Sequence, residues 1–296
     1  MERKDLLHLI SADPQVSPFD VNMAYDAGFD AVIPYSGVSE KEFVPLVQDA
    51  MFSRGPRGAQ HTAIFIGGSS LSLSLRMLEA AKKSFFDPFR LSVMVDPRGA
   101  FTTAAALVAK VRKASKDHGL GGLKGRRVAV LGGTGTVGRV AAALAVREGA
   151  QVVLTSRRLE GAQEAVDEVR GLFGTQVEAR QAGSEEVFAK LASEAEVVLA
   201  TAAVGVKLLS QASLQKLGGP RVVADVNAVP PAGIEGLKPH DDGTEIAPGV
   251  FGLGPLAVGD LKFRTEAALL GTLRDPDQRV VIDPQAAFER ATHLLG

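Results

Sequence analysis

The chain has 296 residues, 46% of them hydrophobic and 23% charged, which is enough to build one large or two medium folded domains. A formal net charge of -1 excludes binding to nucleic acid or to an anionic membrane through overall charge. The absence of cysteine excludes disulfides, thiolate nucleophiles, thiolate zinc sites and iron–sulfur clusters. Because no stretch approaches the ~20 apolar residues of a membrane span, and the first apolar run is too short for a signal peptide, we expect a soluble, uncleaved, cytoplasmic protein.

Short apolar runs alternate with longer segments of helical spacing along the chain. The runs predict buried strands at Leu6–Ile10, Ala63–Ile66, Leu91–Val95, Val128–Leu131, Val152–Thr155, Val197–Ala200 and Val222–Ala224. The longer segments predict helices at Leu71–Phe85, Thr102–Ser115, Val137–Glu148 and Glu160–Phe173, from Pro255 to about Leu273, and from Pro284 to Leu295. This alternation predicts an α/β protein in which helices cover parallel sheets.

One segment in the middle of the chain, Lys116–Gly125, is rich in Gly, Asp and Lys and marks the predicted domain boundary. We expect residues 1–118 to form an α/β substrate domain, joined by the C-terminal helix 284–296. Residues 119–275 are expected to form a Rossmann dinucleotide-binding domain with a parallel sheet. Ligands of open parallel sheets gather beyond the carboxyl ends of the strands, so the active site is predicted in the cleft between the domains.

The glycine-rich turn Gly132-Gly-Thr-Gly-Thr-Val-Gly138 follows a predicted strand and opens a predicted helix. It fits G-x-G-x-x-G, in which the first glycine makes the tight turn, the second lets the backbone approach a pyrophosphate and the third packs the helix on the strand. Such turns also serve merely to connect a strand to a helix, but this context favours dinucleotide binding. The predicted cofactor-binding residues here are Gly133, Gly135, Thr136, Val137 and Gly138.

At the end of the next predicted strand stand Ser156, Arg157 and Arg158, where an NAD-selective protein would usually carry an acidic residue. A hydroxyl followed by two guanidinium groups suits the 2′-phosphate of NADP, because arginine pairs bidentately with phosphate. The alternative is a solvated basic turn that begins the next helix. The sequence therefore predicts NADP as cofactor, while NAD is not excluded.

Several segments resemble the methylene-tetrahydromethanopterin dehydrogenases of methylotrophic one-carbon metabolism, which act in formaldehyde oxidation. They are Ser17–Gly28, Gln60–Gly68, Asp87–Arg90, Thr102–Ala106, Val223–Pro231 and Gly259–Lys262. The resemblance implies hydride transfer from the methylene bridge of a reduced pterin C1 carrier to NADP or NAD, which leaves the methenyl form. It also implies a homo-oligomer.

The resemblance extends to individual residues. Lys262 is implied as the catalytic residue, although a lysine on a helix is usually solvated. Phe19 and Asp20 match a loop motif expected to contact the pterin; the alternative is a loop anchor and helix cap. Further substrate-binding residues are expected to be Gln60, His61, Thr102 and Thr103, with His61 equally compatible with a structural role. After the last two strands of the Rossmann domain, the resemblance and the strand ends suggest cofactor contacts from Ala202, Ala203 and Asn227.

Other functions remain open at this stage. A nucleotide-binding sensor without turnover would carry the same glycine-rich turn. A methylene-tetrahydrofolate dehydrogenase is a second alternative, but its cyclohydrolase-bearing members have a Tyr-x-x-x-Lys motif. Neither of the 2 tyrosines here has a lysine four residues on, which also argues against a short-chain dehydrogenase. The 5 histidines show no ligand spacing, so no metal site is predicted.

Overall fold

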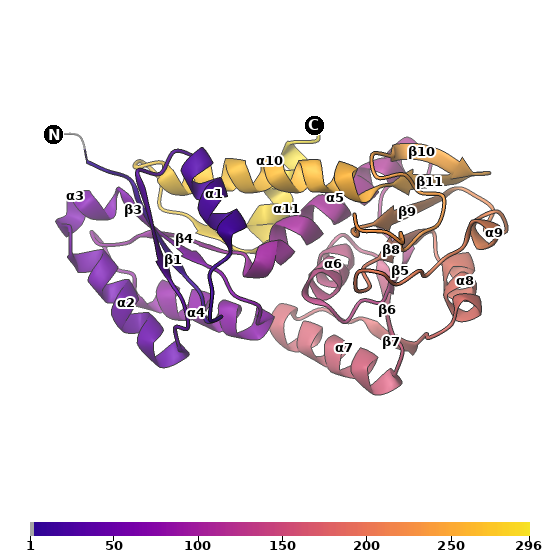
Figure 1. The fold of residues 1–296 in the computed structure, drawn as a ribbon, viewed down its shortest axis with the longest axis horizontal. Helices are drawn as coiled ribbons and strands as arrows, with labels where there is room; N and C mark the ends of the chain where they lie inside the picture. The colour runs from indigo at the N-terminus through magenta and orange to yellow at the C-terminus, as the bar shows by residue number, and fades with distance from the viewer. Residues whose placement is uncertain (1–2) are drawn as a thin grey trace. The chain divides into compact units, whose positions relative to one another are not determined.

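The computed structural model describes residues 3–296, which form two compact units, each built on its own sheet (Figure 1). Unit 1 comprises the chain up to Thr102 together with Phe263–Arg290, and unit 2 comprises Thr103–Lys262 and Ala291–Gly296. The chain passes from one unit to the other within the helices α5 (Ala100–Asp117), α10 (Pro255–Arg274) and α11 (Pro284–His293). The domain boundary placed at residues 118 and 119 stays a prediction of the sequence.

Unit 1 contains a five-stranded parallel sheet with the order β12-β4-β3-β1-β2. Its strands are β1 (Leu6–Ile10), β2 (Ala31–Tyr35), β3 (Thr62–Ile66), β4 (Ser92–Val95) and β12 (Val281–Ile282). The central strand β3 is buried along its whole length, as an apolar run covered on both faces should be. β2 lies at an edge of the sheet. Pro34 is tolerated there because an edge strand does not need every backbone N–H to pair with a neighbouring strand.

Helices cover both faces of this sheet. α1 (Pro18–Asp26) and the 263–274 part of α10 lie on one face, and α2 (Glu40–Phe52) and α4 (Leu71–Ser84) lie side by side on the other (Figure 1). The short α3 (Gly55–Ala59) precedes β3, and a 3-10 turn at Pro97–Gly99 precedes α5. α2 begins with a capping box, in which Ser39 and Glu42 satisfy each other's backbone N–H groups.

Unit 2 contains a seven-stranded sheet with the order β10-β11-β9-β8-β5-β6-β7. Its strands are β5 (Arg127–Leu131), β6 (Gln151–Ser156), β7 (Glu178–Gln181), β8 (Val197–Ala200), β9 (Arg221–Asp225), β10 (Asp242–Ala247) and β11 (Val250–Leu253). All pairs are parallel except β10 with β11. The parallel part has the strand order of a doubly wound dinucleotide-binding sheet. In such a sheet the order in which the chain adds strands reverses between β5 and β8, although the two strands are parallel.

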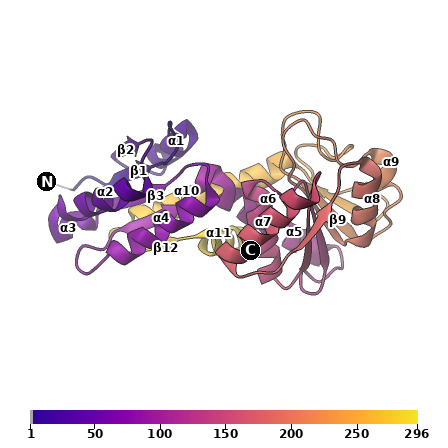
Figure 2. The same ribbon diagram turned by 90° about the horizontal axis from the view of Figure 1, so that it is seen from below.

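The helices of unit 2 also form two layers. α6 (Thr136–Arg147) and α7 (Leu159–Phe173) lie side by side on one face, and α8 (Glu185–Glu194) and α9 (Gln211–Leu214) lie on the other (Figures 1 and 2). Under α8 and α9, a cluster of buried apolar side chains includes Leu131, Phe188, Leu191 and Val198. This cluster holds the carboxyl ends of β5 and β8 in place, and the glycine-rich turn follows β5.

The structure confirms the predicted α/β class with a Rossmann sheet and a second α/β unit. Each predicted strand and helix is present within a few residues of its predicted bounds. The sequence reading omitted several elements, namely β2, β7, β10, β11, β12, α1, α2, α3, α8 and α9. Within residues 3–296, no helix combines the length and the apolar character needed to cross a bilayer.

Candidate functional site

The turn between β5 and α6 is too tight for side chains at its first two glycines. Gly132 has a φ of 66°, which strains any residue with a Cβ, and a Cβ there would lie 2.5 Å from that of Ala202. A Cβ at Gly133 would lie 2.8 Å from the Cγ of Leu154. The N–H groups of both glycines donate to Thr155, at 3.0 Å to its Oγ1 and 3.0 Å to its carbonyl oxygen. The residue with left-handed backbone conformation is thus Gly132. Gly133 is not left-handed, and a glycine is needed there because the backbone packs closely on β6.

The other two glycines of the motif differ in their surroundings. Gly135 is the N-cap of α6 in extended conformation, and a Cβ there would meet no atom within 4 Å. The N–H groups that follow, at Thr136 and Val137, belong to the first helical turn and have no partner within the helix. A Cβ at Gly138 would lie 2.6 Å from the carbonyl oxygen of Gly133. The turn therefore offers an open helix N-terminus of the kind that binds phosphate.

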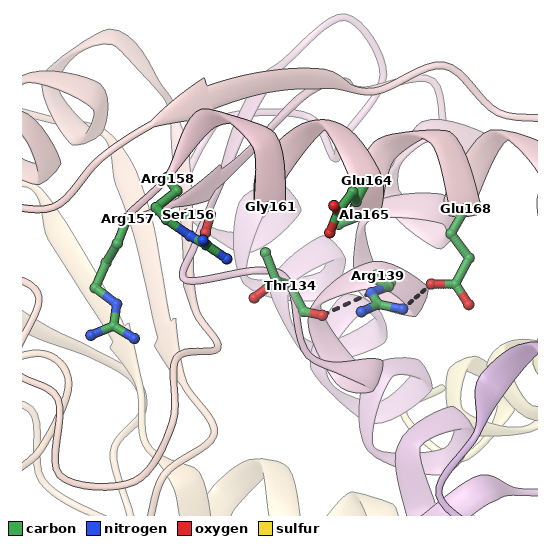
Figure 3. Close-up of a pocket in the computed structure, with 9 residues that line it drawn as sticks. All are labelled: Thr134, Arg139, Ser156, Arg157, Arg158, Gly161, Glu164, Ala165 and Glu168. Carbon is green, nitrogen blue, oxygen red and sulfur yellow. Dashed lines mark hydrogen bonds and ion pairs between the residues drawn. The ribbon is translucent and has the colours of Figure 1, made fainter.

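A pocket of about 660 Å³ lies at the carboxyl end of β6 beside this turn (Figure 3). The residues that line it come from the turn, the start of α6, the end of β6 with the two residues after it, and one face of α7: Thr134, Arg139, Ser156, Arg157, Arg158, Gly161, Glu164, Ala165 and Glu168.

The predicted Ser156, Arg157 and Arg158 all line this pocket. Ser156 is half-buried, and the two arginines are exposed. In Figure 3 the Arg158 side chain runs toward Thr134, whereas that of Arg157 points away from α7. Neither guanidinium group has a hydrogen bond or ion pair to any residue from 3 to 296. Both are available to an anionic ligand.

Arg139 is held differently. Its Nε donates to the carbonyl oxygen of Thr134 at 2.7 Å, and its Nη1 contacts the carboxylate of Glu168 on α7. Partial burial lowers the pKa of Arg139, while the charge of Glu164 opposes that shift. Arginine stays protonated in proteins, and the charged guanidinium group ties the glycine-rich turn to α7.

Asp225, at the end of β9, organises the loop that contains Asn227. Its Oδ1 accepts the N–H of Asn227 at 2.9 Å, and its Oδ2 accepts those of Gly233 at 2.7 Å and Ile234 at 3.3 Å. Burial raises the pKa of Asp225, and these N–H groups work against that rise. Asn227 in turn donates from Nδ2 to the carbonyl oxygen of Ala202 at 2.8 Å. The predicted residues after β8 and β9 are therefore linked, and the next residue, Ala203, is exposed.

In unit 1, polar groups gather where the strands end. Three residues after β1, Asp13 accepts the hydroxyl of Ser69 at 2.7 Å and Nη2 of Arg98 at 3.0 Å. Arg98 is the only residue other than glycine, among residues 3–296, with a positive φ, at 50°. Partial burial would raise the pKa of Asp13, but the bonds from Ser69 and Arg98 prevail and lower it. Asp13 is a charged anchor for the loops after β3 and β4.

Phe19 and Asp20 lie in the first turn of α1, which also follows the carboxyl end of β1. The Asp20 N–H donates to Oγ of the N-cap Ser17 at 3.3 Å, as expected of a helix cap. The Asp20 side chain is 4% exposed and that of Phe19 is 46% exposed. An exposed aromatic ring next in sequence to a buried acidic residue is compatible with the predicted contact to a flat ligand.

Gln60 and His61 lie at the opposite edge of the same sheet. Gln60 ends α3, and His61 directly precedes β3, so both stand at the amino ends of the strands. The His61 Nδ1 lies 2.8 Å from Oδ1 of Asp5, and its carbonyl oxygen accepts from Arg54 at 2.8 Å. The structure does not bring these two predicted substrate residues to the edge where Asp13 and Asp20 lie, and it supports the structural role for His61.

Thr102 is fully buried in the first turn of α5. Its Oγ1 donates to Oδ2 of Asp96 at 2.6 Å, and Oδ1 of Asp96 accepts the N–H of Phe101 at 2.7 Å. The Thr102 hydroxyl thus fixes the start of the helix. Thr103 is the next residue and is half-buried. Lys262 is also half-buried and lies two turns into α10, where the sequence predicts it.

Two protein families match this chain. The family model for methylene-tetrahydromethanopterin dehydrogenase, N-terminal, matches residues 18–98, and the family model for the alanine dehydrogenase/PNT C-terminal domain matches residues 100–254. The NAD(P)-dependent methylenetetrahydromethanopterin dehydrogenase of Methylorubrum extorquens is 38% identical over 298 residues, which cover 99% of both chains. The chain belongs to the methylene-tetrahydromethanopterin dehydrogenase family. This confirms the resemblance found in the sequence.

A second curated protein and two solved structures are also similar to this chain. The bifunctional protein MdtA of the same organism is 39% identical over 291 residues, which cover 98% of this chain and 99% of that one. Among solved structures, shikimate 5-dehydrogenase from Listeria monocytogenes has a TM-score of 0.51 at 16% identity and covers 97% of this chain and 96% of its own. Quinate dehydrogenase from Corynebacterium glutamicum has a TM-score of 0.50 at 15% identity over 100% of both chains. These likenesses show the two-unit α/β fold.

Sequence reasoning missed several polar residues of this dehydrogenase-family chain. Arg139 directly follows the last glycine of the motif, and Glu164 and Glu168 are four residues apart on α7 and so share one helix face, a signal that was present in the sequence. Asp13 and Arg98 had no such signal, because 85 residues separate them. Among residues 3–296 no three His, Asp or Glu side chains are grouped as metal ligands.

Proposed function

We propose that this chain oxidises the methylene bridge of methylene-tetrahydromethanopterin to the methenyl form with NAD(P) as hydride acceptor. The observation that carries the proposal is full-length identity to a dehydrogenase of that name, combined with an open glycine-rich turn at the switch point of a doubly wound sheet. The match begins in unit 1 and continues through unit 2, so it includes both the nucleotide fold and the family's own N-terminal part.

The chemistry fits a site without an acid–base pair. The C–H bond of the methylene carbon breaks with both electrons, and the carbon is left as a cation delocalised onto its two flanking nitrogens. No hydroxyl proton has to leave in the same step. When bound, NAD(P) would supply the hydride acceptor. The protein has to hold carrier and nucleotide in register, and alignment of this kind supplies a large part of the rate.

For the nucleotide, the first turn of α6 and Gly135 would bind the pyrophosphate, and Asn227 would lie beside the nicotinamide. We assign the 2′-phosphate of NADP to the pocket at the end of β6, because Arg157 and Arg158 are exposed there. This assignment makes NADP the preferred cofactor and leaves NAD as a second substrate.

For the carrier, the geometry supports Phe19 and Asp20 as contacts, since they follow the carboxyl end of β1. Lys262 would donate a hydrogen bond to a carbonyl oxygen of the pterin and so fix the ring; an ammonium group close to the methenyl cation would be repelled by it. Thr102 would act only through Asp96, by holding the start of α5. Association into a homo-oligomer and a cytoplasmic location stay predictions of the sequence.

The proposal is tested by steady-state assays of the purified protein at 340 nm with two carriers and two nucleotides. We expect turnover with methylene-tetrahydromethanopterin, and a higher kcat/KM with NADP than with NAD. Turnover with methylene-tetrahydrofolate alone would overturn the choice of carrier. Tight binding of NADPH without turnover of either carrier would overturn the enzymatic function and favour a nucleotide sensor.

A further inference from the structure

The pocket at the end of β6 contains charges of both signs. Three guanidinium groups line it, those of Arg139, Arg157 and Arg158, and so do the carboxylates of Glu164 and Glu168. A pocket built only to attract a phosphate would have no use for carboxylates, because like charges repel. The two carboxylates differ in their surroundings.

Glu168 is accounted for by a partner. Its carboxylate contacts Nη1 of Arg139, and both side chains are about three-quarters buried, with 28% and 25% of their surface exposed. The two charges offset each other, and the pair joins α6 to α7. The charge of Glu168 therefore has little effect on a ligand in the pocket.

Glu164 has no ion pair of this kind, although its charge acts on Arg139. It lies one helical turn before Glu168 on α7, is exposed, and makes no hydrogen bond or ion pair with any residue from 3 to 296. Figure 3 shows its carboxylate on the pocket side of α7, above Arg139. Because Arg139 is paired with Glu168, Glu164 is the one carboxylate of the pocket lining without an ion pair, and its charge opposes those of Arg157 and Arg158 toward an anionic ligand.

We propose that Glu164 is a specificity-determining residue that sets the ratio of NADP to NAD use. Its carboxylate repels the 2′-phosphate of NADP that Arg157 and Arg158 attract, and it has no charge to oppose in NAD, whose ribose carries a hydroxyl there. It thereby keeps NADP from excluding NAD. The inference rests on the proposed function in one respect, namely that the 2′-phosphate binds in this pocket.

The size of the effect follows from Coulomb's law in a solvent-exposed pocket. A carboxylate and a dianionic phosphate some 6–8 Å apart repel by about 1 kcal/mol at the dielectric constant of water, which corresponds to roughly three- to tenfold in affinity. Because both groups are exposed to solvent, salt screens this repulsion: at about 1 M ionic strength the Debye length is only about 3 Å.

The test is Glu164→Gln, which keeps the shape of the side chain and removes its charge. Equilibrium titrations with NADPH and NADH, followed by reduced-nicotinamide fluorescence, measure both dissociation constants at low and at high salt. We expect the dissociation constant for NADPH to fall roughly three- to tenfold at low salt and that for NADH to stay within about twofold. The gain for NADPH should disappear near 1 M salt.

Glu160→Gln is the matched control. Glu160 lies one turn earlier in α7, carries the same charge and does not line the pocket. If it strengthens NADPH binding as much as Glu164→Gln does, the effect is one of net charge and the proposal is wrong. Equal strengthening of NADPH and NADH by Glu164→Gln would also overturn it.

A double variant, Arg157→Ala with Arg158→Ala, separates this inference from the function on which it rests. If the double variant weakens NADPH selectively while Glu164→Gln changes nothing, the 2′-phosphate is in the pocket and only the role of Glu164 is refuted. If the double variant leaves NADPH binding unchanged, the phosphate binds elsewhere, and both the nucleotide assignment and the role of Glu164 are refuted.

Discussion

A methyl group added at Gly138 would test how closely α6 must approach the glycine-rich turn for a nucleotide to bind. A Cβ there would lie 2.6 Å from the carbonyl oxygen and 2.7 Å from the Cα of Gly133. A carbon and a carbonyl oxygen normally stay about 3.3–3.6 Å apart, so turn and helix would have to separate by about 0.7–1 Å. Both contacts are with backbone atoms, which cannot rotate away.

Two opposing contributions decide the effect of Gly138→Ala on stability. Overpacking destabilises by about 1–3 kcal/mol, whereas alanine in place of glycine inside a helix stabilises by up to about 1 kcal/mol. The net loss is then about 0–3 kcal/mol, or a fall of up to about 12 °C in the melting midpoint at about 2–4 °C per kcal/mol. The displaced turn should weaken NADPH and NADH equally, by tenfold or more, since both share the pyrophosphate.

Gly135→Ala is the matched comparison, because a Cβ there would meet no protein atom within 4 Å and the φ of -72° suits alanine. We expect it to leave the melting midpoint within a few degrees and to weaken both nucleotides, since the methyl group stands where the pyrophosphate approaches. Differential scanning fluorimetry and fluorescence titration measure the two quantities. Unchanged nucleotide affinity in Gly138→Ala would refute the argument that close packing makes the turn competent to bind.

Three further variants probe other parts of the molecule. Arg157→Ala with Arg158→Ala should raise the KM for NADP roughly ten- to hundredfold and leave that for NAD nearly unchanged, because charge-assisted contacts to the 2′-phosphate are lost; equal weakening would place the arginines at the shared pyrophosphate. Lys262→Ala should lower turnover at least about tenfold with little change in NADP affinity, because a pterin ring that is misplaced relative to the nicotinamide reacts slowly. Lys262→Arg and a pH profile of turnover serve as comparisons. Wild-type turnover in Lys262→Ala would show that Lys262 is an ordinary solvated lysine. Asp13→Asn should lower the free energy of unfolding at pH 7 by about 1–3 kcal/mol. Because the folded-state pKa of Asp13 lies below its ordinary 3.8, its contribution to stability is present above pH 3.8 and is lost as the pH falls through the lowered value. Urea denaturation should therefore show a smaller difference in unfolding free energy between wild type and Asp13→Asn at pH 3 than at pH 7. An equal difference at both pH values would contradict this prediction.

Local sequence patterns predicted most of the buried strands, with β11 as an exception. β3 contains the apolar run Ala63–Ile66 and was predicted, whereas β7 and β10 are largely exposed and polar, and their sequences contain no run that distinguishes them from a loop. β12 has only two residues and exists because β4 pairs with it. Strands of this kind depend on a neighbour that is distant in the sequence.

In the candidate site, too, the predicted residues lie in short stretches of sequence. The glycine motif and Ser156–Arg158 are each one continuous stretch, and the structure places both at the carboxyl ends of strands of the unit 2 sheet. The resemblance grouped His61 with the substrate contacts, although it precedes the predicted strand Ala63–Ile66 and so lies at its amino end. The sequence alone did not show that Asp5 is the partner of His61. The anchor formed by Asp13 and Arg98 joins loops far apart in the chain and left no local pattern to detect.

The buried carboxylate of Asp225 has an evolutionary consequence. It holds both ends of the loop from residue 226 to 234, because it accepts backbone N–H groups at Asn227 and again at Gly233 and Ile234. Side chains between these points do not take part in that closure. Substitutions there can accumulate while the loop keeps its path and β9 keeps its place in the sheet. The surface that we propose lies beside the nicotinamide can therefore change at single positions without endangering the fold that carries it.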